Sequence, residues 1–115
     1  VQDALGQAIR YRQTGTSLLF HSDRGLQYAA GSFRQVLARH GITQSMARKG
    51  DCWDNAPAES WFATLKRECV PEGAYPSKER ARLDIFRYIE GYYNRNRLHS
   101  ALNYRPPDEY ESLYA

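Results

Sequence analysis

The stretch Leu18-Leu19-Phe20-His21-Ser22-Asp23-Arg24-Gly25 passes from a short apolar run into a polar turn. The apolar run predicts a buried strand, and Asp23 follows where that strand ends. A second acidic residue, Glu59, stands in Asp54-Asn55-Ala56-Pro57-Ala58-Glu59 at the start of a helical stretch, with Lys66 seven positions further on. Carboxylate oxygens at a strand end and a helix start are the ligands that Mg²⁺ prefers, together with phosphate and water. Two such ions can clamp the attacking and leaving oxygens of a phosphodiester displacement.

Working outward from this stretch, the pattern of apolar residues predicts an α/β chain with one domain over residues 1–115. We expect a helix up to Arg10 or Tyr11, a turn at Gly15, and a strand over residues 18–20. A helix over residues 33–40 follows, and then a strand over residues 42–46. Residues 47–55 are predicted to form a loop, the next helix to start near Asn55 and end before Pro71, and the last long helix to be capped by Ser77. Regular structure is expected to end at residues 104–107.

Positive charge is concentrated in the first half of the chain. Residues 1–50 carry seven basic and two acidic side chains, whereas residues 51–115 carry nine basic and eleven acidic ones. Such an uneven distribution favours the binding of a polyanion such as DNA, because binding releases counterions. The Arg48-Lys49-Gly50 stretch is the better candidate for DNA contact, because a basic pair next to glycine leads towards Glu59. For Arg34 and Arg39, a solvated helix face explains the sequence equally well.

The cysteine spacing and the hydropathy of the sequence indicate the cellular compartment. The two cysteines, Cys52 and Cys69, form neither a disulfide framework nor a paired zinc-site spacing, which favours reduced thiols. No apolar run is long enough for a membrane span, and no signal-peptide pattern is found. We therefore expect a cytoplasmic, nucleoid-associated protein without a membrane partner.

Several motifs in the same order resemble the DDE transposases of bacterial insertion sequences, which belong to the retroviral-integrase-like superfamily. The matching stretches are residues 21–28, residues 45–50, residues 54–59 with Lys66, and Tyr92-Tyr93-Asn94-Arg95-Asn96-Arg97-Leu98-His99. By this resemblance Asp23 is the second catalytic aspartate and Glu59 the catalytic glutamate, and both bind Mg²⁺ or Mn²⁺. Lys66 matches the basic residue that contacts DNA in this family.

The resemblance also implies that one part of the site is not matched. The family uses three carboxylates, and its first aspartate lies several tens of residues before the second, whereas only 22 residues precede Asp23. The earlier acid, Asp3, is too close and is predicted to lie on a helix surface. We therefore expect the C-terminal half of a ribonuclease H-like fold, without its three N-terminal strands. Exposed strand edges in such a half favour self-association, so we expect a homo-oligomer.

Other residues are predicted to support the site. His21 is expected to pack or hydrogen-bond near it, and Asn55 to cap the helix of Glu59 or to orient its carboxylate. Asn94, Arg97 and His99 match the C-terminal motif of the family, where a structural network and a role facing DNA are both open. Trp53 and Trp61 can stack on bases, although packing in a core or an interface is favoured.

The predicted function is DNA transposition and integration, with Mg²⁺-dependent cleavage and strand transfer at element ends and target DNA. With two of three carboxylates matched, the chain itself is expected to be incomplete for catalysis. The alternative is a non-catalytic DNA-binding or oligomerising transposase remnant. A basic helical adaptor would leave the motifs around Asp23 and Glu59 without a reason.

Overall fold

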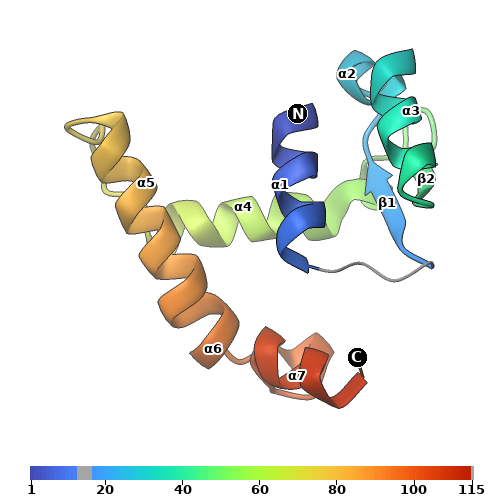
Figure 1. The fold of residues 1–115 in the computed structure, drawn as a ribbon. Helices are drawn as coiled ribbons and strands as arrows, with labels where there is room; N and C mark the ends of the chain where they lie inside the picture. Colours follow the sequence, from blue (N-terminus) through green and yellow to red (C-terminus); the bar gives the residue numbers. More distant parts are fainter. Residues whose placement is uncertain (13–16, 115) are drawn as a thin grey trace. The chain divides into compact units, whose positions relative to one another are not determined.

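The computed structural model describes residues 1–12 and 17–114, and the turn predicted at Gly15 lies outside these residues. The chain divides into two compact units, Val1–Ser60 and Trp61–Ala115. Figure 1 shows the order of the elements along the chain. Within the described residues, no helix is both long and apolar enough to cross a membrane.

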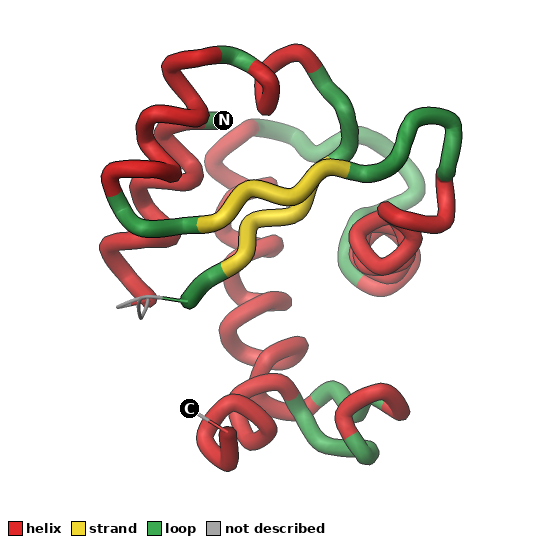
Figure 2. Tube along the Cα trace, turned by 90° about the vertical axis from the view of Figure 1, so that its right-hand side faces the viewer, coloured by secondary structure: helices red, strands yellow, loops and turns green. Residues whose placement is uncertain are grey.

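A pair of parallel strands lies at the centre of the first unit. Strand β1 (Leu19–Ser22) pairs with β2 (Thr43–Met46), with Leu19 opposite Thr43 and Ser22 opposite Met46. The two strands run side by side in Figure 2. Parallel strands need a crossover connection, which helices α2 (Leu26–Ala29) and α3 (Gly31–Arg39) supply here. Both predicted strands are present, and the chain mixes helices with strands as expected, while α2 was not predicted. The prediction that the first strand is buried is wrong for its apolar start, since Leu18 and Leu19 are 41% and 58% exposed.

The core of the first unit forms around α3. Phe33 and Leu37 are fully buried on this helix, and Leu5 of α1 (Gln2–Arg12) and Ile42 pack with them. The ring of Phe33 meets Phe20 of β1 edge-on, with 5.3 Å between ring centroids. Aromatic pairs at such distances contribute about 0.5–1.5 kcal/mol beyond their buried area. This packing holds β1 against α3.

A 3-10 turn precedes the helix that carries Glu59. Turn η1 (Cys52–Asn55) leads directly into α4 (Ala56–Glu68), with Pro57 in the first turn of α4. The carboxylate of Asp51 caps η1 by accepting a 3.1 Å hydrogen bond from the backbone N–H of Trp53. The predicted loop is therefore too long by four residues, because this cap allows the helical run to begin early. The predicted end before Pro71 is confirmed.

The second unit is helical after α4. Ser77 accepts a 3.1 Å hydrogen bond from the backbone N–H of Arg80, which confirms it as the N-cap of α5 (Lys78–Phe86). The helical run then widens into a π-helical segment, which the sequence pattern did not predict. The remaining segments are η2 (Arg87–Tyr93), α6 (Asn94–Asn96) and η3 (Ser100–Leu102).

A last helix, α7 (Pro107–Tyr114), corrects the prediction that regular structure ends at residues 104–107. Proline is well suited to the first position of a helix, since its missing N–H would have no partner there. Asp108 and Glu109 follow in the first turn, where negative charge stabilises the helix dipole. Pro107 therefore starts a helix in this context.

One ion pair joins the end of α4 to the segment after α6. Arg97 binds Glu68 through two nitrogens, with Nε–Oε1 and Nη2–Oε2 distances of 3.0 and 2.7 Å. The hydroxyl of Tyr88 donates to Glu68 at 3.0 Å. The hydrogen bond from Arg97 is the largest cause that lowers the pKa of Glu68 below its ordinary value. Glu68 thus connects three segments of the second unit.

We predict that Glu68→Gln destabilises the protein at neutral pH by about 1–2 kcal/mol, because it leaves the half-buried Arg97 with a weaker, neutral partner. A carboxyl group with a lowered folded-state pKa stabilises the protein above its unfolded pKa, near 4.3, and loses this effect as pH falls through the folded value. The stability difference should therefore shrink in acid. Thermal unfolding at pH 7 and at pH 3 measures it, with the exposed Glu72→Gln as control. A constant difference at both values would contradict the prediction.

Candidate active site

Asp23 lies immediately after the carboxyl end of β1. The preceding Ser22 is buried, and its hydroxyl donates a 2.8 Å hydrogen bond to the backbone oxygen of Asp23. Asp23 is exposed, and its Oδ1 accepts a 2.8 Å hydrogen bond from the N–H of Gly25. This local turn fixes one carboxylate oxygen. The other oxygen makes no hydrogen bond within the described residues and is free to bind a ligand.

Glu59 lies in the first turn of α4 and is exposed. Both Asp23 and Glu59 belong to the unit Val1–Ser60. Glu59 makes no hydrogen bond or ion pair within the described residues, so its two oxygens are also available.

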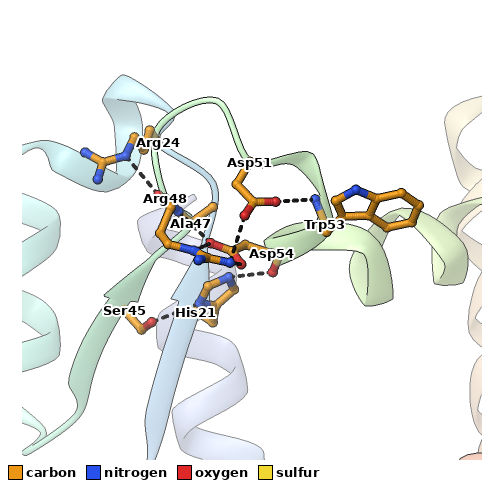
Figure 3. A network of polar contacts seen from close by, with 8 residues as sticks. All are labelled: His21, Arg24, Ser45, Ala47, Arg48, Asp51, Trp53 and Asp54. Carbon is orange, nitrogen blue, oxygen red and sulfur yellow. Dashed lines mark hydrogen bonds and ion pairs between the residues drawn. The ribbon is translucent and has the colours of Figure 1, made fainter.

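His21 links the strand that leads to Asp23 with the turn that leads to Glu59. Its Nδ1 lies 2.9 Å from Oγ of Ser45 on β2, and its Nε2 lies 2.9 Å from the backbone oxygen of Asp54 in η1 (Figure 3). A carbonyl oxygen can only accept, so Nε2 carries the hydrogen and donates it. In the neutral ring Nδ1 then accepts from Ser45. The predicted hydrogen bonding of His21 is confirmed, and it uses both ring nitrogens.

Arg48 closes the loop between β2 and α4. Its backbone N–H and Nε both donate to Oδ2 of Asp54, at 2.8 and 3.0 Å, and its Nη2 lies 2.9 Å from Oδ1. Asp51 takes a further ion pair with Nη2 at 2.7 Å. These contacts are drawn in Figure 3. The hydrogen bond from the Arg48 side chain, followed by that from its backbone, lowers the pKa of Asp54 to about 2.

This pairing changes the expected DNA surface. Arg48 remains exposed, but its charge is balanced by Asp51 and Asp54. Lys49 is exposed and makes no ion pair within the described part of the chain. The guanidinium Nε of Arg24 donates to the backbone oxygen of Ala47 at 2.8 Å, which holds the start of the loop beside the end of β1. Lys49 is therefore the less constrained member of the predicted basic pair.

Asn55 lies inside the helical run, one residue before α4. The capping hydrogen bond at the start of this run comes from Asp51, so the prediction that Asn55 caps it is wrong. The carboxylate of Asp51 is the first side chain that can reach the free N–H groups, because η1 extends the helical run by four residues towards it. Lys66 is exposed on α4, in the same helix as Glu59 and seven positions after it.

The residues of the C-terminal motif form a network within the second unit. Besides its ion pair with Glu68, Arg97 lies 5.9 Å from the ring centroid of Tyr93. His99 meets Tyr93 edge-on at 4.9 Å, and burial lowers the pKa of its imidazole, as does the nearby charge of Arg97. Asn94 is half-buried where η2 meets α6. The sequence left open a structural network and a role facing DNA for these residues. The contacts of Arg97 and His99 support the structural network.

The carboxylates of Asp23 and Glu59 are the candidate metal ligands that the sequence predicts. Among the described residues, no group of three His, Cys, Asp or Glu side chains is placed to hold an ion. Exposed carboxylates with free oxygens suit Mg²⁺, which binds through one or two carboxylates and keeps water and phosphate as its other ligands. Asp23 and Glu59 therefore fit this metal by their chemistry.

The sequence did not indicate the partners that hold the site together. Ser45, Asp51 and the backbone oxygen of Asp54 were not predicted as part of it, although Ser45 and Asp54 each begin a stretch that carries the family resemblance. Side chains alternate between the two faces of a strand, and Ser45 lies opposite His21 in the parallel register of β1 and β2. This alternation was a signal in the sequence that Ser45 could contact His21.

Comparison with known proteins gives the family. A family model described as an integrase core domain matches residues 40–107, and a second model with the same description matches residues 1–52. No solved structure matches the chain significantly.

Curated relatives are insertion-sequence proteins. The transposase for insertion sequence element IS904 of Lactococcus lactis is 39% identical over 96% of this chain and 44% of its own length. Transposase InsF for IS3A of Escherichia coli is 40% identical over 96% of this chain and 38% of its own length. The chain thus spans less than half the length of these relatives. With the motifs around Asp23 and Glu59 and the parallel strand pair, these matches show that the chain belongs to the integrase core domain family, whose fold is ribonuclease H-like.

Proposed function

We propose that this chain contributes two metal-binding carboxylates, Asp23 and Glu59, to a DNA transposition reaction. The reaction is Mg²⁺-dependent cleavage of a phosphodiester followed by strand transfer, with the element ends and the target as DNA partners. Relatives named as transposases support the general activity.

The bridge through His21 is the observation that carries this proposal. Asp23 follows His21 by two residues along β1, and Glu59 follows Asp54 by five residues along the run from η1 to α4. A hydrogen bond of 2.9 Å between His21 and the Asp54 backbone fixes the distance between these two segments. A strand end and a helix start held in this way suit carboxylates that share one metal ion.

Each residue has a distinct role in the proposed reaction. Asp23 and Glu59 would hold Mg²⁺, or Mn²⁺ in its place, and the ion would supply charge neutralisation at the phosphate and activation of the attacking hydroxyl. His21 positions the two segments. Lys49 and Lys66 contact DNA phosphates in this proposal, each as a point charge.

The chain supplies two of the three carboxylates that the family resemblance implies. We therefore propose that residues 1–115 alone bind metal weakly and react slowly. Assembly into a homo-oligomer on DNA is part of the same proposal. The alternative is a non-catalytic DNA-binding or oligomerising transposase remnant, and it agrees with the lack of a three-ligand group among the described residues.

A nicking assay on supercoiled DNA distinguishes these functions. We predict slow nicking that requires Mg²⁺ or Mn²⁺, and we expect Asp23→Asn and Glu59→Gln each to lower it by about 10²-fold or more, the usual effect of removing one electrostatic stabiliser. Glu72→Gln, at an exposed position outside the site, should leave it unchanged.

Fast metal-dependent nicking and strand transfer that Glu59→Gln abolishes would show that the chain is complete, and that the two-of-three account is wrong. Nicking that is equal in the wild-type protein and in both site variants would favour the non-catalytic alternative.

Salt dependence tests the proposed phosphate contacts. We predict that DNA binding weakens steeply with salt, and that Lys49→Ala reduces the slope of log K against log salt by about one. Lys78→Ala, in the second unit, serves as the matched control and should leave the slope unchanged. Fluorescence anisotropy between 50 and 200 mM salt measures the slope. A slope that Lys49→Ala does not alter would place the phosphate contacts elsewhere.

A further inference from the structure

We propose that Trp53 is a binding site for an unpaired nucleobase, in the same helical run as Glu59. This inference rests on the proposed function, which supplies the DNA. It adds a ligand that neither the family matches nor the metal site implies, a base that is not stacked in a duplex.

Trp53 is a large aromatic side chain without a packing role. It is 80% exposed, and its ring contacts no other aromatic ring within the described residues. Trp61 differs, because it is half-buried and meets Phe62 and Tyr93 edge-on at 4.9 and 6.2 Å. The predicted packing is thus confirmed for Trp61. Trp53 does not pack in a core, and its exposed indole is open to a ligand.

The backbone of Trp53 is held from both sides. Its N–H donates to Asp51, and its carbonyl accepts from the N–H of Ala56. Asp51 is in turn held by Arg48, which also binds Asp54. Figure 3 shows the indole extending away from this network. A side chain on such a fixed turn loses little freedom when it binds, which favours stacking.

The local charges favour a base over a phosphate as the ligand. Asp51 and Asp54 carry two negative charges against the single positive charge of Arg48, so these three residues present no net positive charge to a phosphate. Stacking on an aromatic ring uses the π-face that every base has, and it does not require a basic partner. Bases inside a duplex are already stacked, so the ligand is an unpaired or extruded base.

The distance along the helical run places this base near the reacting phosphate. Trp53 precedes Glu59 by six residues in the continuous run from η1 to α4. With a rise of about 2.0 Å per residue in a 3-10 turn and 1.5 Å in an α-helix, the two lie roughly 10 Å apart along the axis. That length corresponds to about three nucleotides of one strand.

Anisotropy binding with matched oligonucleotides tests the inference. The probes are a blunt duplex, the same duplex with a three-nucleotide 3′ overhang, and that overhang without its bases. We expect the wild-type protein to prefer the base-containing overhang by roughly 5- to 100-fold, since stacking is worth about 1–3 kcal/mol per base. Trp53→Ala should bind all three probes alike. Trp53→Phe should keep most of the preference. The control variant Tyr11→Ala, at another exposed aromatic residue, should keep all of it.

A preference that survives in Trp53→Ala, or equal weakening on all probes, would overturn the inference. So would unchanged DNA affinity with reduced self-association in sedimentation, which would make Trp53 a protein contact. Failure of the proposed function gives a different result. Metal-dependent nicking would then be absent, while the wild-type protein and Glu59→Gln would both keep the preference for the base-containing overhang.

Discussion

The imidazole of His21 holds together the three segments on which the candidate site depends. One ring nitrogen binds Ser45 on β2, and the other donates to the backbone oxygen of Asp54 in η1. Because both nitrogens are used within the protein, His21 acts as a positioning residue and has no nitrogen lone pair left for a metal. The same ring fixes where β1 ends relative to the start of the helical run that carries Glu59. Other contacts between these segments are made by Arg24 with Ala47 and by Arg48 with Asp54.

The loop between β2 and α4 is stabilised by charge pairs that involve its own residues. Arg48 binds Asp51 and Asp54, and Asp51 caps the turn that presents Trp53. A basic pair that looks like a phosphate clamp in the sequence therefore has one member, Arg48, that organises the loop, and one, Lys49, that remains available. The hydrogen bonds from Arg48 lower the pKa of Asp54 to about 2, so Asp54 stays ionised near neutral pH. The loop carries an exposed aromatic ring, Trp53, at its surface.

Sequence patterns predicted the elements whose signals are local. The apolar run before Asp23, the helical spacing around Phe33 and the N-cap at Ser77 each depend on a few neighbouring residues, and all three elements are present. The early turn η1 was not predicted, because it depends on the Asp51 carboxylate accepting from the backbone N–H of Trp53. The π-helical segment η2 was not predicted either, since its residues continue the helical spacing of α5. At the site, the sequence indicated the carboxylates and His21 but not their surroundings. The partner of Arg97 lies 29 residues away in Glu68, and no spacing rule indicates such a pair.

The central claim is that Asp23 and Glu59 share one metal ion. Anomalous diffraction from crystals containing Mn²⁺ tests it most directly, with crystals of Glu59→Gln as the control. The account predicts one strong peak with an oxygen of Asp23 and an oxygen of Glu59 both within about 2.1 Å of it, close to the distances that Mg²⁺ makes, and the loss of this peak in the variant. Carboxylates that face separate surfaces, with no Mn²⁺ peak bound by both, would contradict it.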